Sequence, residues 1–185
     1  MKHLIIIGAP RSGKSTLARM MRDTHGHNIL CLDDLASAFE KNFPDVGVTI
    51  GGDLANSPLL ISFVKNYVHG FTQWAYPGIP TIIEGVHISP KDAVELASIA
   101  PDQFQIIVLG YPNITVADKI SQMRKHDGPR DWSSEETDEE LSKGMTETIG
   151  RSQWLQQQCM ELKIPFMDTS FERTPALEKF VSEFI

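Results

Sequence analysis

The fold of this chain is decided by the stretch Gly8-Ala9-Pro10-Arg11-Ser12-Gly13-Lys14-Ser15-Thr16. An apolar run, residues 4–7, precedes it, and residues 17–24 follow with a pattern that favours a helix. The stretch has the spacing G-x-x-x-x-G-K-[ST], a motif that requires a strand before it and a helix after it. Because this sequence meets both conditions, we predict a phosphate-binding loop, or P-loop, between a buried strand and a helix.

Each part of this loop has a physical role in binding a nucleoside triphosphate. Gly8 and Gly13 permit positive φ angles and leave no Cβ between the backbone and a ligand. The N–H groups of the loop can then turn inward, and the helix adds partial positive charge at its N-terminus. The Lys14 ammonium would reach the β- and γ-phosphates, and the Ser15 hydroxyl would coordinate Mg²⁺. We therefore predict that residues 8–16 bind ATP together with Mg²⁺.

Length and composition favour one globular domain. The chain has 185 residues, of which 41% are hydrophobic and 22% are charged. Its net charge of −7 argues against a nucleic-acid surface but leaves room for a local basic pocket. Cys31 and Cys159 lack the spacing of metal ligands, so buried free thiols in a reducing compartment are expected. No apolar run approaches 18 residues and no signal-peptide pattern occurs, so we expect a cytoplasmic protein without a membrane span.

Five short apolar runs alternate with helical patterns, which indicates an α/β fold with a parallel sheet. The runs are residues 4–7, 29–32, 81–84, 105–109 and 166–168. The second and third are separated by more chain than one crossover helix needs, so residues 36–80 are expected to be a substrate-side insertion within the single domain 1–185. Ligands of open α/β sheets bind beyond the carboxyl ends of the strands, so functional residues should follow the strands directly.

Two carboxylates, Asp33 and Asp34, follow the second predicted strand. One of them would accept the proton of a substrate hydroxyl or hold Mg²⁺ through water. The other would cap the helix predicted to start near Leu35. We favour Asp33 for the chemistry because it is the first residue after the strand, although the sequence leaves the assignment of the pair open.

The third predicted strand ends in Glu84, followed by Gly85. A carboxylate there is suited to orienting the hydration shell of Mg²⁺ or a substrate hydroxyl. The glycine would allow a ligand or the P-loop to approach closely. Glu84 is therefore a candidate metal residue beside Ser15 and Asp33.

A basic cluster with a Gly-Pro hinge, residues 124–132, separates two predicted helices, and the segment of about residues 124–136 is expected to act as a small lid. Arg124 and Arg130 would close over the phosphates and neutralise the charge that develops during transfer. Arg151, on the helix predicted to run from Thr137 to about Leu162, would reach the nucleotide from there. A solvated surface arginine is an equally good interpretation of Arg151.

Taken together, these motifs resemble small-molecule kinases of the nucleoside-monophosphate-kinase-like P-loop group. The string Ile83-Glu84-Gly85-Val86-His87, with Pro90 three residues on, is most similar to 2-phosphoglycerate kinases. The acidic pair is placed as in zeta-toxin-like and polynucleotide-kinase-type phosphotransferases, where an acid serves as the base. The resemblance implies a three-layer fold with the sheet order 2-3-1-4-5, use of ATP with Mg²⁺, and transfer to a hydroxyl or a phosphate.

Two functional hypotheses follow. The first is a kinase that transfers the γ-phosphate of Mg·ATP to a small acceptor. The second is an ATP-binding regulatory module or ATPase that transfers no group, although the Asn-Lys-x-Asp string of GTPase switches does not occur. The expected partners are a nucleotide and a small-molecule substrate, without nucleic acid or membrane, and a homodimer remains open.

Overall fold

The computed structural model describes residues 1–51, 58–74, 79–126, 128 and 131–184. Its centre is a sheet of five parallel strands in the order β2-β3-β1-β4-β5. The strands are β1 (His3–Gly8), β2 (Asn28–Cys31), β3 (Thr81–Gly85), β4 (Phe104–Gly110) and β5 (Phe166–Asp168). The α/β class and the predicted strand order 2-3-1-4-5 are confirmed.

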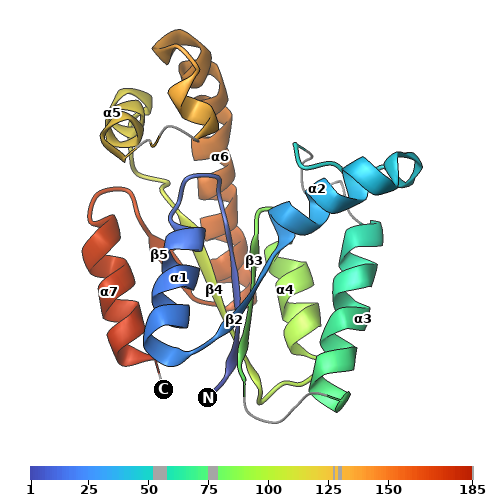
Figure 1. Cartoon of the computed structure of the whole chain (residues 1–185). Coiled ribbons are helices and arrows are strands. Elements are labelled where there is room, and N and C mark those ends of the chain that lie inside the picture. Colours follow the sequence, from blue (N-terminus) through green and yellow to red (C-terminus); the bar gives the residue numbers. More distant parts are fainter. Residues whose placement is uncertain (52–57, 75–78, 127, 129–130, 185) are drawn as a thin grey trace.

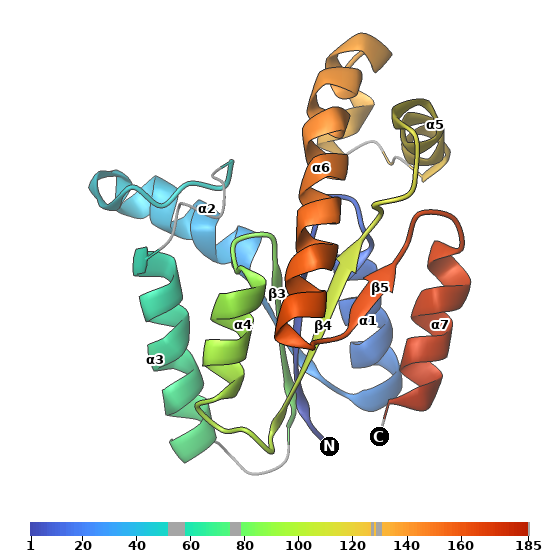
Figure 2. The ribbon, with the colours of Figure 1, turned by 180° about the vertical axis from the view of Figure 1, so that it is seen from behind.

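Helices cover both faces of the sheet and make three layers (Figures 1 and 2). The helices are α1 (Lys14–His25), α2 (Leu32–Asn42), α3 (Pro58–Trp74), α4 (Pro90–Ala97), α5 (Val116–His126), α6 (Asp138–Leu162) and α7 (Arg173–Glu183), with short 3-10 turns η1 (Pro44–Val46) and η3 (Trp132–Ser134). On one face lie α1 and α7, and on the other lie α3, α4 and α6. Both α5 and the N-terminal part of α6 project beyond the carboxyl ends of the strands (Figure 1).

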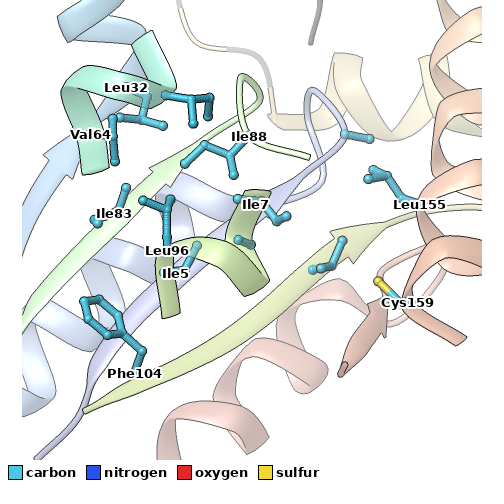
Figure 3. Close-up of a cluster of buried hydrophobic side chains, with 14 of the residues drawn as sticks. Ile5, Ile7, Leu32, Val64, Ile83, Ile88, Leu96, Phe104, Leu155 and Cys159 are labelled. Carbon is cyan, nitrogen blue, oxygen red and sulfur yellow. The ribbon is translucent and has the colours of Figure 1, made fainter. Parts of the chain in front are cut away.

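The central strand β1 explains how these layers form. Its residues 4–7 are completely buried, and successive side chains of a strand point to opposite faces. Ile5 and Ile7 therefore join the core beneath α3, α4 and α6 (Figure 3), whereas Leu4 and Ile6 join the core beneath α1 and α7. An uninterrupted apolar run is the pattern expected for a parallel strand that is covered on both sides.

Side-chain caps fix where two of the helices begin. The Ser89 hydroxyl accepts a hydrogen bond from the Asp92 N–H, and the Asp92 carboxylate accepts the Ser89 N–H in return. Thr137 and Glu140 form the same capping box before α6, so the predicted long helix is confirmed. The first residue of α6, the helix that carries Arg151, is therefore well defined.

The boundary between β2 and α2 differs from the sequence prediction. The strand ends at Cys31, and the helix begins at Leu32 rather than near Leu35. Asp33 and Asp34 consequently occupy the first turn of α2, and within the described residues no side chain caps that helix. The expectation that one of the pair is an N-cap was wrong, because the apolar Leu32 is buried in the core as the first helical residue. Both carboxylates still stabilise the positive end of the helix dipole.

The predicted insertion, residues 36–80, contains most of α2 together with η1 and α3. Its residues 52–57 and 75–78 lie outside the described part of the chain. Val64 of α3 is fully buried in the core beside the sheet, whereas the equally buried Leu60 packs with Ala36 and Val48. Among the helices described, none is both long and apolar enough to cross a membrane.

Candidate active site

A cavity of about 830 Å³ opens at the carboxyl edge of the sheet, around the P-loop. It is lined by Pro10, Arg11, Gly13, Lys14, Ser15, Thr16, Arg19, Asp33, Ile50, Gly51, Val86, His126, Asp131, Arg151 and Arg173. Five of these side chains are lysine or arginine, whereas two are carboxylates. In a chain with a net charge of −7, this concentration of positive charge makes the cavity a candidate anion-binding site.

The backbone of the P-loop is shaped to receive that anion. Gly8 has a φ of 153°, and a Cβ built there would lie 2.0 Å from the backbone oxygen of Leu109. Gly13 precedes α1 in the left-handed conformation with a φ of 103°, and no described side chain caps the helix. The first N–H groups of α1 have no acceptor within the helix, so they are available to phosphate oxygens. The buried Ser12 hydroxyl also has no hydrogen-bond partner among the described residues.

Lys14 lies at the bottom of the cavity. Its ammonium donates a 2.8 Å hydrogen bond to the backbone oxygen of Ala9, and the residue is 6% exposed. Burial lowers the pKa of Lys14 to about 8, although the nearby Glu84 and Asp33 carboxylates act in the opposite direction. The two carboxylates favour the charged form of Lys14, and its ammonium lies where it can compensate the charge of a bound phosphate.

Two oxygen groups suited to Mg²⁺ lie beside this lysine. The Ser15 hydroxyl donates to Oε1 of Glu84 over 3.2 Å, and Glu84 is buried. In the described residues, no group of three or more His, Cys, Asp and Glu side chains forms a metal cage. Mg²⁺ commonly binds through one or two protein oxygens, waters and substrate phosphates, so this donor set fits the ion.

Asp33 lines the same cavity and contacts His87, whose side chain is completely buried. The Nε2 atom of His87 lies 3.2 Å from Oδ1 of Asp33. The His87 contact, assisted by Lys14, lowers the pKa of Asp33 below its usual value although burial opposes the change. Asp34 is exposed and lies outside the cavity lining. The structure therefore places Asp33, not Asp34, beside the predicted phosphate site.

Of the predicted arginines, Arg151 reaches the cavity and Arg124 does not. Arg151 crosses from α6 to donate a hydrogen bond to the backbone oxygen of Val86, just beyond β3. Arg124 instead donates to the Asp138 carboxylate and to the backbone oxygen of Ser133. These hydrogen bonds connect α5 to the start of α6 and to the segment before it. The prediction for Arg130 falls outside the described residues.

Three charged residues of the cavity were missed by the sequence analysis: Arg19, Arg173 and Asp131. The side chain of Arg173 packs over Gly13, where a Cβ would lie 3.2 Å from its Cδ atom. Asp131 forms a 3.0 Å ion pair with Arg11 of the P-loop. The loop is thus bordered by cations from α1 and α7 and by a carboxylate from the predicted lid.

Comparison with solved structures supports the fold assignment. A gluconokinase from Sinorhizobium meliloti 1021 has a TM-score of 0.58 and 13% identity, with 98% of this chain and 90% of that chain covered. A sugar kinase from Janibacter sp. HTCC2649 has a TM-score of 0.59 and 16% identity, covering 98% and 93%. A shikimate kinase from Bacteroides thetaiotaomicron has a TM-score of 0.56 and 12% identity, covering 98% and 94%.

The chain therefore has the fold of P-loop small-molecule kinases. No protein-family model matches the sequence, and no curated protein matches it either. The similarity is one of fold, with the same strand order and helices on both sides of the sheet. The predicted resemblance to the P-loop kinase group is confirmed at this level, whereas the subgroup of 2-phosphoglycerate kinases and zeta toxins stays a prediction.

Proposed function

We propose that this protein is a small-molecule kinase that transfers the γ-phosphate of Mg·ATP to a hydroxyl or phosphate group of a small acceptor. The observation that carries the proposal is that Lys14, Ser15 and Asp33 line one cavity, with the buried Glu84 hydrogen-bonded to Ser15. These groups supply a phosphate-binding cation, two metal-binding oxygens and a candidate base. The fold shared with gluconokinase, sugar kinase and shikimate kinase structures supports the same class of reaction.

The chain's own residues would hold the triphosphate. In this proposal the N–H groups of Arg11 and of residues 13–16 bind the phosphate oxygens, and Lys14 moves its ammonium from Ala9 to the β- and γ-phosphates. Arg11, Arg19 and Arg173 neutralise further negative charge at the same cavity. Ser15 and Glu84 would hold Mg²⁺, which supplies neutralisation of the phosphate charge during transfer.

Asp33 would act on the acceptor. Its lowered pKa keeps the carboxylate ionised at neutral pH, as a proton acceptor must be. His87 contacts the buried Oδ1 atom of Asp33, and the side chain as a whole is 46% exposed, so the rest of the carboxylate is left to face the cavity. Arg151, anchored on Val86, would position an anionic group of the nucleotide or the acceptor. Asp33 would also contact the metal through water.

The test is to measure ADP release from Mg·ATP with a panel of acceptors. The panel holds 2-phosphoglycerate, gluconate, shikimate, simple sugars, nucleosides and nucleoside monophosphates. A single acceptor that stimulates turnover supports the proposal and names the substrate class. Tight ATP binding without stimulation by any of them contradicts the proposal and favours an ATP-binding module that transfers no group.

A further inference from the structure

The carbonyl groups at the start of the P-loop are each held by a side chain. The backbone oxygen of Ala9 accepts the Lys14 ammonium at 2.8 Å. The next oxygen, of Pro10, accepts the Tyr111 hydroxyl at 2.7 Å, and that of Arg11 accepts the Lys119 ammonium at 3.0 Å. Tyr111 follows β4 and Lys119 lies on α5, so two distant segments converge on successive residues of the loop.

These contacts act on a turn that is unfavourable by itself. The Ser12 N–H donates to the Ala9 oxygen over 3.3 Å and closes a four-residue turn around Pro10 and Arg11. Arg11 has a φ of 58°, in the left-handed region. Glycine is the residue that normally occupies such a position, because a Cβ there clashes with the backbone. Something outside the turn must therefore stabilise it, and the contacts to the Pro10 and Arg11 oxygens do so.

Lys119 is an unusual residue to find at this place. It is 2% exposed, although a lysine is almost never fully buried without compensation. Its ammonium lies 3.6 Å from the centroid of the Tyr111 ring, a cation–π contact, and its only other polar partner in the described chain is the Arg11 oxygen. Burial lowers the pKa of Lys119 to about 7, and the positive charges of Arg173, Arg11 and Lys14 act in the same direction.

Burying the Lys119 ammonium therefore lowers the stability of the folded protein, but it places a donor at the P-loop. A methionine at the same place would fill the volume without the cost of burying a charge. In its protonated form, Lys119 adds a strong donor for the Arg11 carbonyl and a cation against the Tyr111 ring, whose hydroxyl holds the preceding carbonyl. Because the peptide is planar, holding the Pro10 oxygen on one side turns the Arg11 N–H to the other, and holding the Arg11 oxygen turns the Ser12 N–H toward Ala9, which closes the turn.

We propose that Lys119 is a positioning residue for nucleotide binding, which acts with Tyr111 to hold residues 9–12 in the conformation that accepts phosphate. The inference rests on the proposed function, because it assumes that the loop binds the phosphates of a nucleotide. It also connects α5, the helix that leads into the predicted lid, to the loop through one side chain.

The test compares Lys119→Met with Lys179→Met by calorimetric titration with MgADP. Lys179 lies on α7 with a side chain that is 74% exposed, so it controls for the loss of one lysine charge. We expect Lys119→Met to weaken MgADP binding by about tenfold, the effect of losing one charge-assisted hydrogen bond, and Lys179→Met to bind normally. Normal MgADP affinity in folded Lys119→Met would overturn the inference alone. Wild-type protein that binds no MgADP would overturn the proposed function and the inference with it.

A second variant and a second measurement cover the case in which Lys119→Met fails to fold. Tyr111→Phe removes only the hydroxyl that holds the Pro10 oxygen, and it should weaken MgADP binding in the same direction. Hydrogen exchange by mass spectrometry should show faster exchange in the peptide that covers residues 8–17 of this variant, with the peptides of α7 unchanged. Unchanged MgADP affinity and loop exchange in Tyr111→Phe would overturn the inference, because the loop would then not depend on these contacts.

Discussion

The Ser15 hydroxyl lies 3.2 Å from Oε1 of Glu84, although 69 positions of sequence separate the two residues. The strand order explains the contact. β1 and β3 are parallel neighbours in which Ile6 is paired with Glu84. An acid at the end of β3 therefore lies beside the loop that follows β1, where a hydroxyl at the start of α1 can reach it. In the proposed function these two oxygens would hold Mg²⁺.

Glu84→Gln should lower the contribution of Mg²⁺ to nucleotide binding. The amide keeps the size of the side chain and its hydrogen bond to Ser15 but removes the negative charge. We expect the affinity for MgADP to fall about tenfold, the lower end of the range for residues that support a metal site, while the affinity for ADP in EDTA changes little. Calorimetry with and without Mg²⁺ measures both. An equal loss in the two conditions would show that Glu84 acts on the loop and not on the metal.

Lys14→Ala should lose nucleotide affinity while the protein stays folded. The substitution removes a buried ammonium, whereas the Ala9 oxygen keeps its hydrogen bond from the Ser12 N–H. Binding of MgATP should weaken by roughly tenfold to a hundredfold, as expected for losing a charge-assisted contact. Titration calorimetry and a thermal unfolding scan, with exposed Lys179→Ala as the control, test this. Normal turnover in Lys14→Ala would rule out the P-loop assignment.

The strands and the P-loop could be predicted because their signals are local in sequence. Parallel strands that are buried on both faces are continuous apolar runs, as residues 4–7 show, and the loop motif is contiguous. The start of α2 could not be placed correctly, because the apolar Leu32 continues the pattern of the strand yet is the first residue of the helix. The periodicity of a short apolar run does not distinguish the end of a strand from the start of a helix.

Arg173, Arg19 and Lys119 were missed as well. Arg173 and Lys119 lie on α7 and α5, which only tertiary packing brings to the loop, whereas Arg19 follows Ser15 by one turn of α1 and could have been predicted from helical spacing. One signal was available for Lys119, because it falls within the buried stripe of α5 that contains Ile120 and Met123. A lysine on the apolar face of a helix indicates a partner for its charge.

Asp33→Asn should retain nucleotide binding and lose transfer. Its carboxylate lies in the cavity and is fixed by His87, whereas Asp34 is exposed one residue further along the first turn of α2. The turnover of Asp33→Asn should fall by about a hundredfold or more, in the range for a general base, with the MgATP affinity within about threefold of wild type. Asp34→Asn is the matched control. If Asp34→Asn is the inactive variant, the assignment of the acidic pair is reversed.

The protein should become less stable as the pH falls below about 6.5. His27 is buried at the opposite edge of the sheet, where its Nε2–H donates to the backbone oxygen of Lys2. Burial lowers the pKa of His27 from the usual 6.5. Burial also lowers the pKa of His3, and the neighbouring charge of His27 acts in the same direction. The unfolded chain then binds more protons at these two histidines. Their contribution to stability is fully present above pH 6.5 and is lost as the pH falls through their lower pKa values in the folded protein.

Urea unfolding at pH 7.5 and pH 5.5 measures this dependence. The free energy of unfolding should decrease at the lower pH in the wild type and decrease less in His27→Gln, because glutamine keeps a donor for the Lys2 oxygen but does not titrate. An equal decrease in both proteins would place the pH dependence on other groups.

Gly8→Ala should destabilise the protein more than Gly26→Ala, although both glycines have positive φ angles. A Cβ at Gly8 would lie 2.0 Å from the backbone oxygen of Leu109, which accepts the Ala9 N–H and belongs to the paired strand β4. Neither strand can move without breaking the ladder, so we expect a loss of about 3 kcal/mol or more. Gly26 has a φ of 75° and open space around it, so only the conformational cost of about 1 to 2 kcal/mol applies. Equal urea midpoints for the two variants would show that the close approach of the P-loop to β4 is not what requires glycine at position 8.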